Sequence, residues 1–244
     1  TNADIRGALN VEGEVKGDKE KLTVNGISDI AGSDTTFQAV LKEFAPRQVH
    51  ANIKNLRLDK ALYMLHQPHY TDGLLSLDMQ IKNVQIGNLD GVIHTKIAQG
   101  LLDTKLLTKQ MKFKSAMPTT NYTLNATSVL RDNLVDSKIT LDSTLAKLDI
   151  KSALFNIEDS SIKSDYTATI KSLDKLFFVT QQHMRGVLLA QGEFKKDKDL
   201  DLTMHSDIAG GKIHAKLHND DFRADITSVQ TLDLLHMLIY PEIF

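Results

Sequence analysis

Apolar and polar residues alternate along much of this chain, and this period of two constrains its fold more than any other feature. The alternation is clearest in residues 138–142, 147–151, 200–205 and 212–218. Successive side chains of a β-strand point to opposite faces, so the pattern predicts strands with one dry and one wet face. The apolar residues assigned to the dry face are Ile139, Leu141, Leu148, Ile150, Leu200, Leu202, Met204, Ile213 and Leu217. Turn formers such as Gly210-Gly211 separate the strands, as in a meandering all-β protein.

The chain also repeats itself, so one structural unit is expected several times. The matching segments are residues 7–19 with 186–198 (seven identical positions), 28–32 with 206–210 (Ser-Asp-Ile-Ala-Gly in both), and 91–96 with 211–216. Self-similarity at a long period is the signature of a repeat architecture. We therefore predict one elongated repetitive β unit over residues 1–244. Its predicted cassettes are residues 7–68, 73–182 and 186–244, with residues 98–167 as extra strands inserted into the middle one.

Three segments change from strand spacing to helical spacing. They are residues 56–67, 172–182 and 231–240, and in the first of them Leu58, Leu62 and Leu65 follow i, i+4, i+7 spacing. Each is predicted to be a helix of two to three turns that closes a cassette, either plugging an open end of the sheet or packing on its core. The predicted fold class is mainly β: a long curled antiparallel sheet forming an open trough, or β-taco, with a few short helices.

Composition narrows the function classes. The chain has 29 Lys and Arg against 31 Asp and Glu, a net charge of −2, and no basic patch, which argues against nucleic acid as a partner. It has no cysteine, which excludes disulfides, thiolate metal sites and cysteine nucleophiles and fits an oxidising compartment such as the periplasm. No apolar run approaches the length of a membrane span. The chain begins at Thr1 without a signal-peptide pattern, so we expect it to be part of a longer protein.

Motifs for catalysis or metal binding are missing from the sequence. There is no Gly-x-Ser-x-Gly elbow, no phosphate-binding Gly-Lys-Ser/Thr loop and no dinucleotide fingerprint. His66 and His69 flank Pro68, which disrupts a helix there, and His214 and His218 have Lys216 between them on the same strand face. An ammonium group at that place disfavours a cation, so solvent-facing histidines are the expectation. We predict a protein that is not an enzyme and has no metal or cofactor.

The dry face suggests a function of its own. A sheet with one apolar face must cover it with a second sheet, with helices or by curling on itself. Strands are many and helices few here, so a trough that is dry inside fits best. An apolar trough suits acyl chains, because exposing a methylene to water costs about 0.8 kcal/mol. The nine dry-face residues named above are therefore the predicted lining of a lipid groove.

The Gly-led alternating cassettes, the Leu-Asp-Leu-Leu helix of residues 232–235 and the recurring Gly-x-Ile-x-x-Lys strands resemble the AsmA-like family of bacterial envelope proteins, the TamB and YhdP type. The resemblance implies a periplasmic β-taco whose parent protein is anchored in the inner membrane and reaches toward the outer membrane. It implies phospholipid as the ligand, contact with both membranes through other parts of the parent chain, and support of outer-membrane biogenesis. Unpaired edge strands further predict end-to-end self-association.

Two alternatives from other classes remain open at this point. A structural β-solenoid, as in an adhesin or autotransporter passenger, would pack its interior solid and show short coils of near-constant length. The cassettes here are long and uneven and are interrupted by helices. A two-domain lipid-binding enzyme is the other alternative, for which the sequence offers no catalytic residues.

Overall fold

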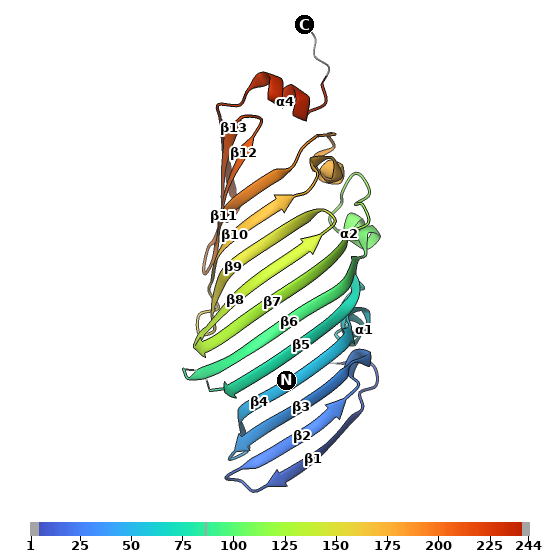
Figure 1. Cartoon of the computed structure of the whole chain (residues 1–244), viewed down its shortest axis with the longest axis vertical. Helices are drawn as coiled ribbons and strands as arrows, with labels where there is room; N and C mark the ends of the chain where they lie inside the picture. Colours follow the sequence, from blue (N-terminus) through green and yellow to red (C-terminus); the bar gives the residue numbers. More distant parts are fainter. Residues whose placement is uncertain (1–4, 86, 241–244) are drawn as a thin grey trace. The chain divides into compact units, whose positions relative to one another are not determined.

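The computed structural model of the chain describes residues 5–85 and 87–240. Fourteen strands form one antiparallel sheet in the order of the sequence, and among the described residues β1 and β14 have a single neighbour each, so the sheet is open (Figure 1). The strands are β1 (Val11–Gly17), β2 (Leu22–Ser28), β3 (Asp34–Lys42), β4 (Ala45–Arg57), β5 (Thr71–Asn83), β6 (Leu89–Leu102), β7 (Asn121–Asp132), β8 (Leu134–Ser143), β9 (Ala146–Asn156), β10 (Ile162–Ile170), β11 (Leu188–Lys196), β12 (Leu200–Ile208), β13 (Gly211–His218) and β14 (Asp221–Thr227). The helices are η1 (Ile30–Gly32), α1 (Leu58–Met64), α2 (Thr104–Gln110), η2 (Leu173–Leu176), α3 (Phe177–Thr180) and α4 (Thr231–Met237). The predicted fold class, an open antiparallel sheet with a few short helices, is confirmed.

The chain divides into two compact units, which we describe separately. Unit 1 comprises residues 1–103 and 121–137, and unit 2 comprises residues 104–120 and 138–244. Unit 1 therefore holds β1 to β7 with η1 and α1, and unit 2 holds β9 to β14 with most of β8 and the other helices. Residues 241–244, with which the third predicted cassette ends, lie outside the described residues.

Each unit has an apolar face and a polar face, because residues directly opposite each other on antiparallel strands point the same way. Following the cross-strand pairs, the apolar face of unit 1 consists mainly of Val11, Val15, Val24, Phe37, Ala39, Val49, Ala51, Ile53, Leu75, Leu77, Met79, Ile81, Ile93, Ile97, Leu124 and Ala126. That of unit 2 consists mainly of Leu148, Ile150, Ala168, Ile170, Leu188, Ala190, Phe194, Leu202, Met204, Ile213, Ala215, Leu217, Phe222, Ala224 and Ile226. Polar and charged side chains occupy most of the alternate positions.

The repeat seen in the sequence is also a repeat of register. The equivalent cross-strand pairs are Val11–Ser28 with Ala190–Ser206, and Thr35–Ile53 with Ile213–Ile226. In both copies the closing helix bonds back to the segment before the first strand: Arg6 N donates to Met64 O at 3.0 Å, and Arg185 N donates to Met237 O at 2.8 Å. β1 to β4 with α1, and β11 to β14 with α4, are thus two copies of a four-strand cassette closed by a helix.

The Ser-Asp-Ile-Ala-Gly motif makes the turn after β2 and after β12. Gly32 and Gly210 have φ of 74° and 73°, the left-handed region that glycine adopts without strain. In the first copy the Ser28 hydroxyl accepts a hydrogen bond from Ile30 N at 3.2 Å. The interpretation of this motif as turn chemistry rather than catalysis agrees with its geometry.

Helix α2 corrects the sequence prediction, which confined helices to three segments and assigned residues 98–167 to strands. Here β6 ends like β4: Gln99 is left-handed like Asn55, and a seven-residue helix follows in each case. After α2, Lys112 is left-handed, as His66 is after α1. The helices therefore divide the strands into β1–β4, β5–β6, β7–β10 and β11–β14, and the middle predicted cassette contains two of these groups.

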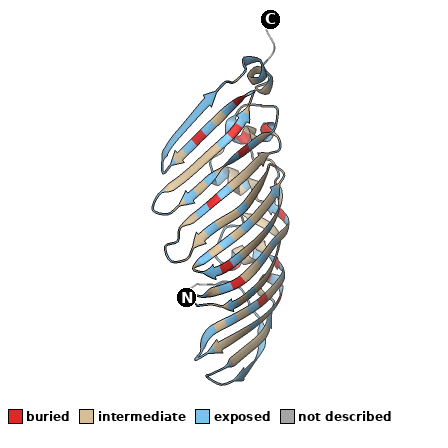
Figure 2. Ribbon diagram, turned by 60° about the vertical axis from the view of Figure 1, so that its left-hand side comes forward, coloured by how far each residue is buried: buried red, intermediate tan, exposed pale blue. Residues whose placement is uncertain are grey.

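Buried residues are few, and many of them gather where helices meet strand ends (Figure 2). Even-numbered strands all end at the same edge of an antiparallel sheet, so the helices that follow them share that edge within a unit. In unit 1, Ala31 of η1, Leu56 of β4 and Met64 of α1 form the buried cluster. In unit 2, Leu173 and Phe178 are buried at the corresponding edge.

Candidate functional site

The nine residues predicted to line a groove all belong to unit 2, and the structure brings them onto one face. Leu202 lies opposite Leu217, and Leu200, Met204 and Ile213 share their side of the β12–β13 ladder. Leu148 and Ile150 of β9 join this face through their β10 partners Ala168 and Tyr166, which lie opposite Ala190 and Gly192 of β11.

The two residues of β8 belong to the same face. Asp149 accepts a hydrogen bond from Thr140, so these two side chains share the polar face. Ile139 and Leu141 flank Thr140 along β8 and therefore point to the apolar side. All nine predicted residues thus lie on the same face of unit 2.

Several strands of this surface were not predicted from the sequence. In unit 2, β10, β11 and β14 contribute Ile170, Leu188, Phe194, Phe222 and Ile226. In β10 and β11, small or polar residues such as Ser164 and Gly192 lie on the apolar side and interrupt the alternation. β14 alternates strictly, with Phe222, Ala224 and Ile226 on the apolar side, and was overlooked nonetheless. The repeat was the signal that could have found them, because β11 matches β1 and β14 matches β4. The apolar face of unit 1 was also missed, although β5 alternates strictly from Leu75 to Lys82.

The apolar faces carry almost no charge. Among the paired positions of both faces, the charged residues are Asp132 of β7, opposite Leu89, and Lys196 of β11, at the hairpin end, where its Nζ donates to Lys198 O at 3.3 Å. The polar side chains that interrupt the face of unit 2 satisfy their hydrogen bonds locally. Ser206 Oγ donates to Leu189 O at 2.7 Å, and Tyr166 Oη donates to Thr203 O at 2.8 Å. Burial raises the pKa of the Tyr166 hydroxyl. In unit 2 these polar side chains therefore have hydrogen-bond partners, whereas in unit 1 the buried Nε of Arg47, at the bulge of β4, has none in the described structure.

These faces are half-buried rather than covered. Met204, Ile213 and Leu217 are half-buried in the described structure, whereas the buried strand residues are mostly small ones such as Ala190 and Ala215. A closely packed protein core would bury the large side chains first. Large apolar residues that stay partly accessible over several neighbouring strands form the kind of surface that marks a binding site.

Helices close one edge of this surface. In unit 1, Leu58 and Ala61 of α1 pack with Ile53 and Leu75 around the buried cluster. In unit 2, the ring of Phe178 meets that of Phe113, which follows α2, edge to face at 4.9 Å. The opposite strand ends are joined by short polar turns, such as the one in which Asp197 Oδ1 accepts from Asp199 N at 3.0 Å. Each apolar face thus has a closed apolar edge and a polar edge.

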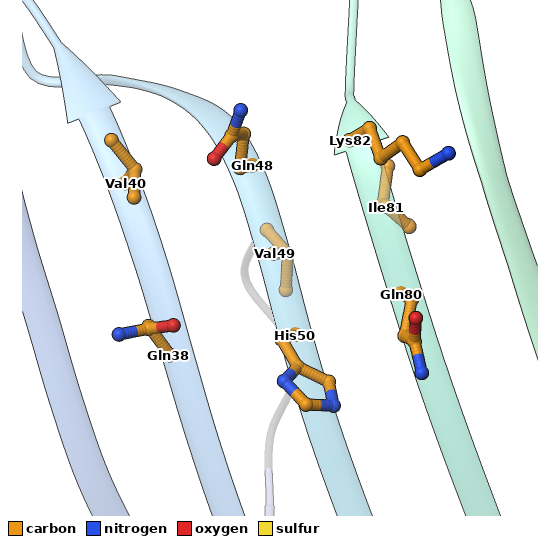
Figure 3. A pocket seen from close by; sticks show the side chains of 8 residues that line it. All are labelled: Gln38, Val40, Gln48, Val49, His50, Gln80, Ile81 and Lys82. Atoms are coloured by element: carbon orange, nitrogen blue, oxygen red, sulfur yellow. The ribbon is translucent and has the colours of Figure 1, made fainter.

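The polar faces are hydrated surfaces held by cross-strand pairs. Figure 3 shows part of the polar face of unit 1, with Gln38, His50 and Gln80 in one row across β3, β4 and β5. A hydrogen bond from Asn52 lowers the pKa of the Asp78 carboxyl in the next row. In unit 2 the hydrogen bond from Lys195 lowers the pKa of Asp197 to about 2. Such exposed pairs are ordinary surface chemistry.

The histidines singled out in the sequence lie apart from any metal-like cluster. His69 Nε2 contacts Asp72 Oδ1 at 2.9 Å, and His218 Nδ1 contacts Asp201 Oδ1 at 2.9 Å. His214 faces His205 across the β12–β13 ladder, with 2.6 Å between their Nδ1 atoms. Within residues 5–85 and 87–240, no three His, Asp or Glu side chains converge in a way that could hold a metal ion.

No helix in the described part of the chain is both long and apolar enough to cross a bilayer. Searches of protein-family models, curated proteins and solved structures found no match to this chain.

Proposed function

We propose that this chain is a periplasmic segment of an AsmA-like envelope protein and that its apolar faces shelter or conduct the acyl chains of phospholipids. The observation that carries the proposal is the half-buried apolar face of each unit, with most charged residues confined to the other face. About 25 cal/mol is gained for each Å² of apolar surface removed from water, so a face of this kind favours an apolar ligand.

The dimensions of unit 2 suit acyl chains. Seven strands from β8 to β14, spaced about 4.8 Å apart, extend about 29 Å across the strands. The hydrocarbon core of a bilayer is about 30 Å thick and holds two layers of acyl chains, so one chain needs about half of that length. A phospholipid tail laid across the strands would therefore fit within unit 2, with its headgroup at an edge of the sheet.

The resemblance to the AsmA-like family supplies the setting of this proposal. In that setting the parent protein is anchored in the inner membrane, and the segment moves or shelters phospholipid on its way to or from the outer membrane, which supports outer-membrane biogenesis. The chain acts without catalysis and needs no cofactor.

The β-solenoid alternative is less well supported. Solenoids such as the parallel β-helix wind successive coils, whereas every strand here pairs antiparallel with its neighbour in sequence. A solid interior would also bury its large side chains, and those of the apolar faces are half-exposed.

Native mass spectrometry of the chain, purified gently from cells and then mixed with phospholipid, tests the proposal. We expect adducts with the mass of intact phospholipids that survive gentle activation. Delipidated chain that takes up no phospholipid, while remaining folded by circular dichroism, would contradict the proposed function.

A further inference from the structure

One charged side chain lies among the paired positions of the apolar face of unit 2, that of Lys196 at the end of β11. Lys196 lies opposite Ile162 of β10 and Leu200 of β12 and is half-buried. Its Nζ donates a hydrogen bond to Lys198 O, in the turn after β11, at 3.3 Å. A charge held on an apolar surface is unfavourable unless water or an opposite charge compensates it. The ammonium group therefore sits at the boundary between the apolar face and a polar turn.

Both carboxylates of the adjoining turn have other partners. Asp197 forms an ion pair with Lys195 on the polar face, with 2.8 Å between Oδ2 and Nζ. Asp199 Oδ1 accepts a hydrogen bond from Asn219 Nδ2 at 3.0 Å. Among the described residues, Lys196 Nζ has a backbone carbonyl as its partner and forms no ion pair. This cation is therefore available to an anionic group that a ligand brings.

The hairpin itself does not require a cation at this place. By the sequence repeat, the residue of the first cassette that corresponds to Lys196 is Gly17. The turn that follows is the same in both copies, because an aspartate accepts a hydrogen bond from the backbone N–H two residues further on. The distance is 2.9 Å for Asp18 and 3.0 Å for Asp197. Since the first cassette makes this turn after a glycine, the positive charge of Lys196 is not needed to form it.

A row of large apolar side chains begins beside Lys196. Phe194 lies two residues before Lys196 on the same strand and therefore points to the same face. From Phe194 the row continues through directly opposite residues of β12, β13 and β14, namely Leu202, Leu217 and Phe222. Three strand spacings of about 4.8 Å give this row a length of about 14 Å. One acyl chain spans about half of a 30 Å hydrocarbon core, so one tail fits along the row.

Building on the proposed lipid function, we propose that Lys196 binds the phosphate group of a phospholipid whose acyl chain lies along the row from Phe194 to Phe222. An ammonium group and a phosphate oxygen form a charge-assisted hydrogen bond, which is stronger than one between neutral partners. The phosphate supplies the opposite charge that Lys196 lacks, while the tail covers the apolar residues next to it. Phospholipid is then preferred over a neutral lipid with the same tails.

Two lipids that differ in the headgroup alone test this inference. The delipidated full chain is titrated with dioleoylphosphatidylglycerol and with dioleoylglycerol, and native mass spectrometry gives the affinity for each. Lys196→Gln removes the charge but keeps a long polar side chain, and Lys196→Arg keeps the charge. The matched control is Lys163→Gln, which removes a charge from the exposed polar side of β10 near the same end of the sheet.

We expect the unmodified chain to bind dioleoylphosphatidylglycerol about three- to tenfold more tightly than dioleoylglycerol. Lys196→Gln should lose this preference while it keeps its affinity for dioleoylglycerol. Lys163→Gln and Lys196→Arg should both retain the preference. Circular dichroism of each variant checks that the sheet remains folded.

Protection of lysines from acetic anhydride provides a readout that needs no substitution. Peptide mass spectrometry should show that dioleoylphosphatidylglycerol slows the acetylation of Lys196 and leaves that of Lys163 unchanged. Inorganic phosphate alone should not protect Lys196. Equal protection by inorganic phosphate would indicate a site for free anions and would overturn the assignment to a lipid headgroup.

The outcomes also separate this inference from the proposed function. Equal affinity for both lipids, or a preference that survives Lys196→Gln, would show that Lys196 merely keeps its ammonium group in water. Either result would overturn the inference and leave the proposed binding of acyl chains standing. Uptake of neither lipid by the folded chain would overturn both.

Discussion

A charge placed on the apolar face of β13 should reduce lipid binding without unfolding the chain. Ile213 lies between Ser206 and Ile226 across the ladder and is half-buried. Full burial of an isoleucine is worth about 1.5–3 kcal/mol, so a half-buried one contributes about 1–1.5 kcal/mol. A carboxylate that water still reaches adds about 1–2 kcal/mol of desolvation. We expect Ile213→Asp to lower the free energy of unfolding by about 2–3 kcal/mol, a loss that a domain of ordinary stability survives.

The matched control is Lys216→Asp, three residues along the same strand on the polar face, where Lys216 is exposed. Its free energy of unfolding should change by no more than about 0.5 kcal/mol. Urea unfolding gives the stabilities, and native mass spectrometry gives the bound phospholipid. We expect lipid to be lost in Ile213→Asp and kept in Lys216→Asp. A folded Ile213→Asp chain with unchanged lipid content would refute the assignment of this face. Complete unfolding of Ile213→Asp, which requires a loss of more than about 4–5 kcal/mol in the free energy of unfolding, would instead indicate a solid core.

Three further predictions concern the fold. Gly192→Ala should destabilise unit 2 strongly, because a Cβ at this position would lie 1.8 Å from Thr203 O. Thermal unfolding measures this effect, and an unchanged melting temperature would contradict the prediction. Met64→Ala should lower the free energy of unfolding by about 2–4 kcal/mol, because it leaves a cavity in the buried cluster under α1. The control Tyr63→Phe, at an exposed position of the same helix, should change it by no more than about 0.5 kcal/mol; urea unfolding measures both. The pKa of Asp197 is lowered from 3.8 to about 2 by Lys195, so its contribution to stability is full above pH 4 and is lost as the pH falls toward 2. Asp197→Asn should flatten the stability curve in that window, and an unchanged curve would exclude the Lys195 pair as a cause.

The sequence predicted the faces of the sheet better than its helices. Alternation assigned Leu202, Met204 and Ile213 to one face because a side-chain period of two admits one arrangement once the segment is a strand. α2 was missed although α1 and α4 are equally long, because its apolar residues Leu106 and Leu107 are adjacent and give no helical spacing within the helix. Asn55, Gln99 and Ser228 mark where strands give way to helices, but their left-handed backbone is set by tertiary contacts and leaves little trace in the sequence.

The candidate surface shows a similar limit. The residues found from alternation lie in β8, β9, β12 and β13, whereas β10 and β11 were overlooked because Ser164, Tyr166 and Gly192 interrupt their apolar positions. These interruptions have local causes. The hydroxyl of Tyr166 donates a hydrogen bond to Thr203 O of β12. The residue opposite Tyr166 is Gly192, where a side chain would collide with Thr203 O and the Tyr166 hydroxyl. Such compensations between strands become visible only when the register is known.

Photo-cross-linking tests the central claim most directly. A photoreactive phenylalanine derivative replaces Leu202 on the apolar face or its neighbour Thr203 on the polar face of β12, and each protein is irradiated with labelled phospholipid. The account predicts covalent attachment of acyl chains at position 202 and none above background at position 203. Equal labelling at both positions, or labelling confined to position 203, would contradict it.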